Sequence, residues 1–235
     1  MDIDQKLKRA YELHRQGKLQ EAELVCREVL KIHPENYDAL SLLGTISYQM
    51  GDYESSVTYI QQVIGINPND AQAYYILGIV LQKKNDCDEA IASYKKAIEL
   101  NPQFAGAYNN LGNILRENGH LDAAIHSYQK VIELDPLNAL PYNNLGNVLQ
   151  EKNQLDDAII AYKKALEIDS NYFFTYNNLG NVFHKKGLFN EALTCYQKAI
   201  QLNSHYADAY YSLGNLFAEM ANLDDAEKHY RGYCM

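Results

Sequence analysis

Hydrophobic and polar positions follow each other along the chain with the spacing of amphipathic α-helices. In residues 105–138, Tyr108 and Leu111 fall on one side of a helical wheel, together with the leucine four positions later. Gly119 then offers a position where the backbone can turn left-handed, and a second helical pattern runs from there to the residue before Pro136. The segment is therefore predicted to form two helices joined by a short turn.

This two-helix segment recurs every 34 residues, and three series of residues keep the same register. The prolines are Pro34, Pro68, Pro102 and Pro136, the glycines are Gly44, Gly78, Gly112, Gly146, Gly180 and Gly214, and the small residues are Ala22, Ser56, Ala90, Ala124, Ala158, Ala192 and Ala226. Because coincidence does not produce three such series in register, the chain is predicted to consist of tandem repeats. The repeats are 3–36, 37–70, 71–104, 105–138, 139–172, 173–206 and an incomplete 207–235, all within one domain over 1–235.

Small residues predict how the helices of a repeat meet. Gly112 and Ala124 allow two backbones to approach closely, and Tyr108 and Tyr128 are expected to fill the remaining gaps. A single helix pair cannot bury its own apolar face, so the repeats must stack into an all-α solenoid of antiparallel helix pairs. The acidic or amide residues near the start of each second helix are expected to be N-caps: Asp88, Asp122, Asp156, Asn190 and Asp224.

Composition narrows the class of protein. Arg and Lys number 21 and Asp and Glu number 30, so the formal charge is −9, which disfavours binding to nucleic acid. Four cysteines lie far apart without a Cys-x-x-Cys pair, as in a protein of a reducing compartment. Neither a signal peptide nor an apolar stretch of roughly 20 residues is present in the sequence. These features predict a cytoplasmic protein without membrane insertion.

No residue pattern for catalysis or for a metal or cofactor site is found. The seven histidines show no i, i+4 pairing with His or Cys, and neither a Gly-rich phosphate loop nor a nucleophile elbow occurs. Carboxylate pairs such as Asp156-Asp157 lie at predicted helix starts, where they complement the helix dipole. We therefore expect a protein that is not an enzyme and that has no catalytic residues, cofactor or metal.

The polar side of the first helices carries an unusual number of asparagines. The motif Tyr-Asn-Asn-Leu-Gly-Asn begins at Tyr108, Tyr142 and Tyr176, and a partial version begins at Tyr210. Asn is a poor helix former, so its repetition requires a reason. The predicted peptide-binding residues on this side are Asn109, Asn110, Asn113, Arg116, Asn143, Asn144, Asn147, Asn177, Asn178, Asn181, Tyr211 and Asn215.

Two explanations of these asparagines remain open. They either form hydrogen bonds between helices and spread by duplication of a repeat, or they line a concave groove and bind the backbone of a ligand. An amide provides two donors and an acceptor, which suits peptide C=O and N–H groups of any sequence. Stacked helices lie roughly 10 Å apart, and an extended peptide advances about 3.3 Å per residue. Asn110, Asn144 and Asn178 would then meet every third ligand residue.

The earlier repeats differ at the equivalent positions. They present Ser41, Thr45, Tyr75 and Ile79 where later repeats present Asn. We expect this part of the groove to contact apolar side chains of the ligand and the Asn part to contact its backbone.

The pattern Tyr-x-x-Leu-Gly, followed by Ala, Tyr and Pro at fixed distances, resembles the tetratricopeptide repeat (TPR) family over nearly all of the chain. The resemblance implies a right-handed superhelical solenoid of about seven repeats whose partner is a protein or peptide. Tyr replaces the Trp that is frequent at the first motif position, and the first repeat has Arg9-Ala10 in place of Leu-Gly.

The asparagines also resemble those in the TPR region of O-linked N-acetylglucosamine transferases and SPINDLY-like proteins. Asn110, Asn144 and Asn178 match the Asn two residues before the Gly, whereas Leu42, Ile76 and Ser212 do not. This resemblance implies a region that recruits substrates for a larger glycosyltransferase. The alternatives are a free-standing assembly scaffold and a chaperone adaptor that binds a peptide carboxylate. For the adaptor, the candidate cations Lys83, Arg116 and Lys185 are offset by Glu117, Glu151 and Glu219.

The repeat pattern stops abruptly after Tyr230, with Arg-Gly-Tyr-Cys-Met and no polar capping helix. One interpretation is a fragment of a longer protein. The other is a homo-oligomer in which the apolar end near Leu213 and Phe217 docks on a second copy. Light scattering across a concentration series separates the two, since docking predicts a mass that rises with concentration.

Overall fold

The structure of the protein is a computed structural model that describes residues 2–222 and 225–227. Thirteen α-helices with defined bounds lie in this part of the chain, and residues 225–227 are helical as well, in agreement with the predicted all-α class. Their bounds are α1 (Ile3–Arg15), α2 (Leu19–Ile32), α3 (Tyr37–Gln49), α4 (Tyr53–Ile66), α5 (Ala71–Lys83), α6 (Cys87–Leu100), α7 (Ala105–Glu117), α8 (Leu121–Leu134), α9 (Ala139–Glu151), α10 (Leu155–Ile168), α11 (Phe173–Lys185), α12 (Phe189–Leu202) and α13 (Ala207–Glu219).

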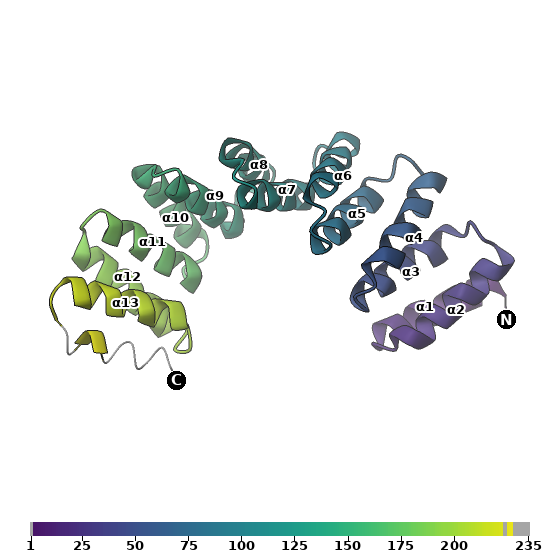
Figure 1. The fold of residues 1–235 in the computed structure, drawn as a ribbon, viewed down its shortest axis with the longest axis horizontal. Helices are drawn as coiled ribbons and strands as arrows, with labels where there is room; N and C mark the ends of the chain where they lie inside the picture. Colours follow the sequence, from purple (N-terminus) through teal and green to yellow (C-terminus); the bar gives the residue numbers. More distant parts are fainter. Residues whose placement is uncertain (1, 223–224, 228–235) are drawn as a thin grey trace. The chain divides into compact units, whose positions relative to one another are not determined.

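The helices are arranged in two compact units, residues 1–114 and residues 115–235, and each unit is described by itself. In the first unit α1 packs on α2, α3 on α4 and α5 on α6, as Figure 1 shows. In the second unit α9 packs on α10 and α11 on α12, and each pair also contacts the first helix of the next repeat. This arrangement confirms the predicted stack of antiparallel helix pairs within each unit.

The turns between paired helices adopt the predicted left-handed geometry. Glycines occupy this position at Gly17, Gly51, Gly119 and Gly187, with φ angles between 73° and 79°. Asn85 and Asn153 take the same geometry at φ 64° and 60°. Asn tolerates a left-handed backbone better than other residues with a Cβ. Ala221, which departs from the pattern, still has φ 59°, so the turn is kept there at the expense of local strain.

At Gly78, Gly146 and Gly180, the Gly of the Leu-Gly pair lies against a buried tyrosine of its partner helix. A Cβ added at Gly146 would lie 2.5 Å from the ring of Tyr162, and one at Gly180 would lie 2.6 Å from the ring of Tyr196. Both tyrosines are completely buried. The predicted close approach of the two backbones is therefore confirmed in these repeats, because no other residue leaves room for the ring.

The repeats nearest the N-terminus have a different core. Ile60 takes the place of the buried tyrosine beneath Gly44, and Cys26 takes it in the first repeat. Ser56 replaces the small Ala, and its hydroxyl donates a hydrogen bond of 2.7 Å to the carbonyl oxygen of Gly44. Burial raises the pKa of the Cys26 thiol to about 12, so this thiol is a neutral packing group.

Four of the five predicted N-caps of the second helices are wrong. α8 begins at Leu121 with His120 at the N-cap position, and α10 begins at Leu155 with Gln154 there, so the acidic residues lie inside the first turn. The one residue between the left-handed turn residue and the helix takes the N-cap position, and it is His120 in α8 and Gln154 in α10. Among the second helices with defined bounds, only α4 has a capping Asp there, since Asp52 accepts a hydrogen bond from the N–H of Ser55. Asp122 and Asp156 instead form ion pairs with Lys152 and Lys186 of the following repeats. Asp88 and Asn190, also predicted as caps, lie in the first turns of α6 and α12. The fifth predicted cap, Asp224, lies outside the described residues.

Two further predictions concern docking through the C-terminal end and insertion into a membrane. The segment from Tyr230 onward, on which the prediction of C-terminal docking rests, lies outside the described residues. Within the described part, no helix combines the length and the apolar character needed to cross a bilayer.

Candidate functional site

The predicted peptide-binding asparagines lie on one side of the first helices. In the second unit, the side chains of Asn144, Asn147, Asn178 and Asn181 are partly exposed, and we call these four residues the amide face. They come from α9 and α11, which contact each other directly. The amide face is the part of the predicted site that remains open to a ligand within one unit.

Two predicted residues are directed into the protein. Asn143 is 5% exposed and Asn177 is 4% exposed. The hydroxyl of Thr175 donates to the oxygen of Asn143 over 2.9 Å, and Asn178 donates to the same oxygen over 3.3 Å. These bonds join α9 to α11, so Asn143 connects consecutive repeats. The structural explanation of the asparagines therefore holds for this position.

Asn178 links the buried and the open parts of the site. Its Nδ2 group donates to the oxygen of Asn143 and also, over 3.0 Å, to the oxygen of Asn147. The same donor group thus bridges two side chains of the preceding repeat. Since its nitrogen is occupied in this way, Asn178 presents its oxygen to a ligand as an acceptor.

The core tyrosines orient the next asparagine in each repeat. The hydroxyl of Tyr162 lies 2.7 Å from the oxygen of Asn147, and that of Tyr196 lies 2.9 Å from the oxygen of Asn181. Burial raises the pKa of both tyrosines, so both hydroxyls keep their protons and donate. Sequence reasoning missed this link. Its signal was the Tyr that recurs 15 residues after the Asn.

Tyr162 also lies 3.0 Å from the Oε1 of Gln150. A hydroxyl has one proton and cannot donate to two oxygens. The shorter distance assigns the proton to Asn147, whose oxygen also accepts from Asn178. The amide of Gln150 then meets the tyrosine oxygen with its NH₂ group, an orientation that follows from the network.

This network fixes what the amide face offers to a ligand. The oxygens of Asn147 and Asn181 are held by tyrosines, and among the described residues no hydrogen bond occupies the Nδ2 of either. The two NH₂ groups are donors for peptide carbonyls, and the oxygen of Asn178 between them is an acceptor for a peptide N–H. The amide face thus offers both donors and an acceptor to the backbone of an extended peptide.

The first unit contains a related but smaller arrangement. Asn110 on α7 donates to the hydroxyl of Tyr75 on α5 over 3.3 Å, and Asn109 donates to Asn110 over 3.4 Å. Tyr94, the buried tyrosine of the third repeat, lies 2.9 Å from the Oε1 of Gln82, and Ile79 stands where later repeats have Asn. Within this unit, an apolar side chain on α5 thus takes the place of an asparagine on the polar side of the later first helices.

The remaining predicted residues are more dispersed. Asn113 is partly exposed on α7, and Arg116 at the end of α7 lies 3.7 Å from the carboxylate of Glu151. Asn215 is partly exposed on α13, and Tyr211 of the same helix is 52% exposed. Pairing with Glu151 weakens Arg116 as a partner for a peptide carboxylate.

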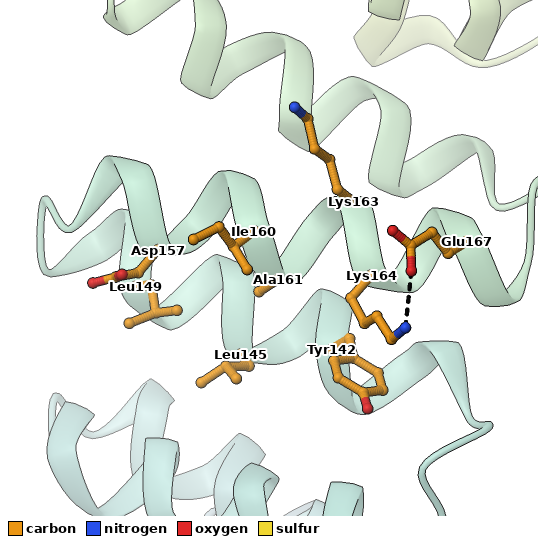
Figure 2. Close-up of a pocket in the computed structure, with 9 residues that line it drawn as sticks. All are labelled: Tyr142, Leu145, Leu149, Asp157, Ile160, Ala161, Lys163, Lys164 and Glu167. Carbon is orange, nitrogen blue, oxygen red and sulfur yellow. Dashed lines mark hydrogen bonds and ion pairs between the residues drawn. The ribbon is translucent and has the colours of Figure 1, made fainter.

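A pocket of about 580 Å³ lies on the opposite side of α9, as shown in Figure 2. Tyr142, Leu145 and Leu149 of α9 line it together with Ile160 and Ala161 of α10. On a helical wheel these α9 residues lie about 180° from Asn144 and Asn147. Charged side chains at its edge include Lys164 and Glu167, which form an ion pair of 2.8 Å. The pocket is thus separate from the amide face.

No group of His, Cys, Asp or Glu side chains that could hold a metal ion occurs among the described residues. The free thiols of Cys26 and Cys195 are buried, and burial raises the pKa of the Cys195 thiol to about 11. The helix pairs, the stacking and the amide face define a helical-repeat scaffold for protein interaction.

The chain belongs to the TPR family. The family model described as TPR repeat matches residues 81–119, 112–153, 146–187 and 182–220. A model described as anaphase-promoting complex, cyclosome, subunit 3 matches residues 15–97. No curated protein matches the sequence.

Solved structures support the same assignment. The chain is 28% identical to MamA with a TM-score of 0.61, over 67% of this chain and 92% of MamA. It is 25% identical to YrrB, described as a TPR protein with an unusual peptide-binding site, with a TM-score of 0.60 over 74% of this chain and 90% of YrrB. A tetratricopeptide repeat protein from Parabacteroides merdae has a TM-score of 0.79 at 14% identity over 98% of this chain and 91% of that one, which shows the fold alone.

Proposed function

We propose that the protein binds an extended peptide or partner segment on the amide face of α9 and α11. The observation that carries the proposal is the orientation of Asn147, Asn178 and Asn181 by bonds to the core and to each other. Amides that are already held in one orientation lose little conformational entropy when a ligand binds. The peptide-binding site described for YrrB supports the same class of ligand.

Recognition of this kind depends on the backbone of the ligand and not on its side chains. It therefore predicts broad specificity and modest affinity. The carboxylate-adaptor alternative would require a cation on the amide face, and the four amides provide none.

The wider setting that we propose is the recruitment of substrates to a larger glycosyltransferase-like protein. Its support is the resemblance of Asn144 and Asn178 to the asparagines of O-linked N-acetylglucosamine transferase repeats. A free-standing assembly scaffold is the alternative. The full reading frame beyond Met235 distinguishes the two, since the first requires a catalytic domain in the same protein or in a bound partner.

The test of peptide binding compares two sets of variants. A displayed library of 12-residue peptides is selected against the full chain, and a selected peptide is then titrated by fluorescence anisotropy. Asn144→Ala with Asn178→Ala should weaken binding about tenfold or more, because the Asn178 acceptor is lost together with the hydrogen bond by which Asn178 orients Asn147. Tyr142→Phe, which removes an exposed hydroxyl away from the amide face, is the matched control and should bind like the wild type.

Thermal unfolding by circular dichroism accompanies the titration. The double variant is expected to remain folded with a lower midpoint, because Asn178 also bonds to Asn143. Unchanged affinity in a folded double variant would show that the asparagines only join repeats, and the proposal would be abandoned.

A further inference from the structure

The start of α11 departs from the repeat pattern. Phe173 and Phe174 occupy positions that are Ala139-Leu140 in the preceding repeat and Ala207-Asp208 in the following one. The ring centroids of Phe173 and Phe174 are 4.0 Å apart, and Tyr206 packs against them at 5.0 and 5.2 Å in edge-to-face geometry. Phe174 is nevertheless 45% exposed. Duplication of a repeat does not explain this aromatic cluster, since the neighbouring repeats lack it.

A buried amide beside the cluster lacks a partner. The oxygen of Asn177, which is 4% exposed, makes no hydrogen bond among the described residues. One repeat earlier, the equivalent oxygen of Asn143 accepts from Thr175 and Asn178. The residues 34 positions after those two donors are Ala209 and Ser212. Ala has no donor and Ser is shorter than Asn, so the oxygen of Asn177 is left without either bond.

Tyr206 lies close to both Asp208 and Asn177, and both groups act on the pKa of its hydroxyl. Burial, together with the charge of Asp208, raises the pKa of Tyr206 to about 12, so the hydroxyl keeps its proton at neutral pH. The oxygen of the Asn177 amide remains without a hydrogen-bond partner beside this hydrogen-bonding group and the two phenylalanines.

Phe173 and Phe174 precede Asn177 by one turn of α11, so the three side chains share one face of the helix. The oxygen is covered in this structure. A donor reaches it when a ring moves aside, and Phe174 is the most exposed ring of the cluster. Rotation of this side chain opens the cluster from the same helix that carries Asn178 and Asn181.

Three features of the cluster favour one kind of ligand group. The unpartnered oxygen requires a donor, the ring faces attract a cation, and the carboxylate of Asp208 attracts a positive charge. A guanidinium satisfies all three, since it is planar, charged and has five N–H groups. A tryptophan or tyrosine of the ligand would provide a ring and one donor but no charge. The negative charge of the whole chain, −9, also favours a basic partner.

We propose that the aromatic cluster formed by Phe173, Phe174 and Tyr206, with Asn177 and Asp208, is a subsite for an arginine side chain of the peptide that lies on the amide face. The inference rests on the proposed function. It adds a side-chain preference to a surface that otherwise recognises only the backbone.

The experiment uses the displayed library against the full chain and a matched pair of synthetic peptides. One selected peptide is made with arginine and again with citrulline, which keeps the shape of the side chain and removes its charge. Both are titrated by fluorescence anisotropy. The selected peptides should contain a basic residue at a fixed place, and replacement by citrulline should weaken binding to the wild type about tenfold.

Variants locate the effect. Asp208→Asn should reduce the difference between the two peptides to about twofold, and Phe174→Ala should do the same. Leu140→Ala is the matched control, because Leu140 is 41% exposed and occupies the position equivalent to Phe174 in the preceding repeat. This control should keep the wild-type difference. Circular dichroism confirms that each variant is folded, and the two peptides on the wild type test the subsite even if one variant is not.

The outcomes separate the two proposals. Selected peptides without a basic residue, or equal binding of arginine and citrulline, would overturn the arginine subsite. If such peptides still lost affinity in the Asn144→Ala, Asn178→Ala variant, the amide face would remain a binding surface. A library that yields no binding peptide would overturn the proposed function and the subsite together.

Discussion

Two repeats share the same pair of helices but differ in their cores. They are the second repeat, formed by α3 and α4, and the fifth repeat, formed by α9 and α10. In the second repeat Ile60 lies beneath Gly44, whereas in the fifth Tyr162 lies beneath Gly146. Both residues are almost completely buried. Only the tyrosine has a hydroxyl that reaches the polar side of the first helix, where it holds Asn147.

The polar side of the first helix changes with the core. Leu42 in α3 is 4% exposed and belongs to the hydrophobic core of the first unit. Its counterpart in α9 is Asn144, which is partly exposed. Thr45 is the counterpart of Asn147 in this repeat, which has no tyrosine hydroxyl below it. The hydroxyl of Thr45 donates to the backbone oxygen of Ser41 in the same helix. The comparison indicates that a buried tyrosine orients a partly exposed asparagine, and that the two form one element of the proposed binding surface.

The largest expected effect tests the packing of the glycines. Gly146→Ala should destabilise the protein by about 3 kcal/mol, because the new Cβ would meet a rigid, fully buried ring. At Gly44 the new Cβ would come within 3 Å of one atom, Cγ1 of Ile60 at 2.9 Å, whereas at Gly146 it would come within 3 Å of three ring atoms of Tyr162. Gly44→Ala should therefore cost about 1 kcal/mol or less, with part of the cost offset by helix propensity. Urea unfolding of both variants measures the difference, and equal losses would contradict this account of the two cores.

Alkaline pH should destabilise the tyrosine-containing repeats. Burial raises the pKa of Tyr162 and Tyr196, and it raises that of Tyr128 to about 12, whereas unfolded tyrosine ionises near its ordinary value of about 10. Between about pH 10 and 12 the folded state binds more protons than the unfolded state, so stability is complete below this range and falls as the pH rises. Each buried tyrosine should contribute a loss of about 1.4 kcal/mol per pH unit in this range.

Urea midpoints measured from pH 8 to 11 test this prediction. The thiols of Cys26 and Cys195, whose pKa values burial raises to about 12 and about 11, add losses that begin near pH 9 and are the same in the wild type and the variant. The Tyr162→Phe, Tyr196→Phe variant should show a flatter dependence than the wild type. An identical dependence in both proteins would show that these tyrosines do not control alkaline unfolding.

Removal of one hydroxyl should have a moderate effect. Tyr162→Phe keeps the ring beneath Gly146 but removes the donor to Asn147, and it should cost about 1 to 2 kcal/mol. Tyr142→Phe removes an exposed hydroxyl that bonds weakly to the carbonyl of Pro136 at 3.4 Å, and it should change stability by less than about 0.5 kcal/mol. Thermal unfolding of the two variants makes the comparison. A neutral Tyr162→Phe would mean that the hydroxyl does not orient the asparagine.

The smallest effect concerns the bond between repeats. Thr175→Val removes the buried donor to Asn143, which keeps its bond from Asn178, so the loss should be about 1 kcal/mol. Affinity for a selected peptide should not change, because Thr175 is buried. Reduced affinity without a change in stability would place Thr175 in the binding surface.

The sequence was sufficient to predict the repeats, the helix pairs and the left-handed turns. These features depend on spacing and on local geometry, both of which can be read from Gly, Pro and the apolar pattern. The N-caps could not be predicted, because the starts of α8 and α10 are determined by the turn before them. Asp is favourable both at an N-cap and in the first turn of a helix, so the sequence does not decide between the two places for Asp122. Its ion pair with Lys152 depends on how the next repeat packs.

The candidate site was predicted only in outline. Asn143 and Asn144 are adjacent and chemically identical, yet one is buried against α11 and the other is partly exposed. Which one faces the next repeat depends on how that repeat packs, and the position of Thr175 becomes evident only in the structure. The unpartnered oxygen of Asn177 likewise depends on what the following helix lacks.

The central claim is that the amides of α9 and α11 contact the backbone of a bound peptide. The side-chain NH₂ signals of Asn147 and Asn181 in a ¹⁵N-resolved NMR spectrum report on it most directly, since these are the donors left for the ligand. On titration with a selected peptide, both signals should shift together and saturate with the affinity measured by anisotropy. Saturable binding with both signals unmoved, while signals elsewhere on the protein shift, would contradict the account.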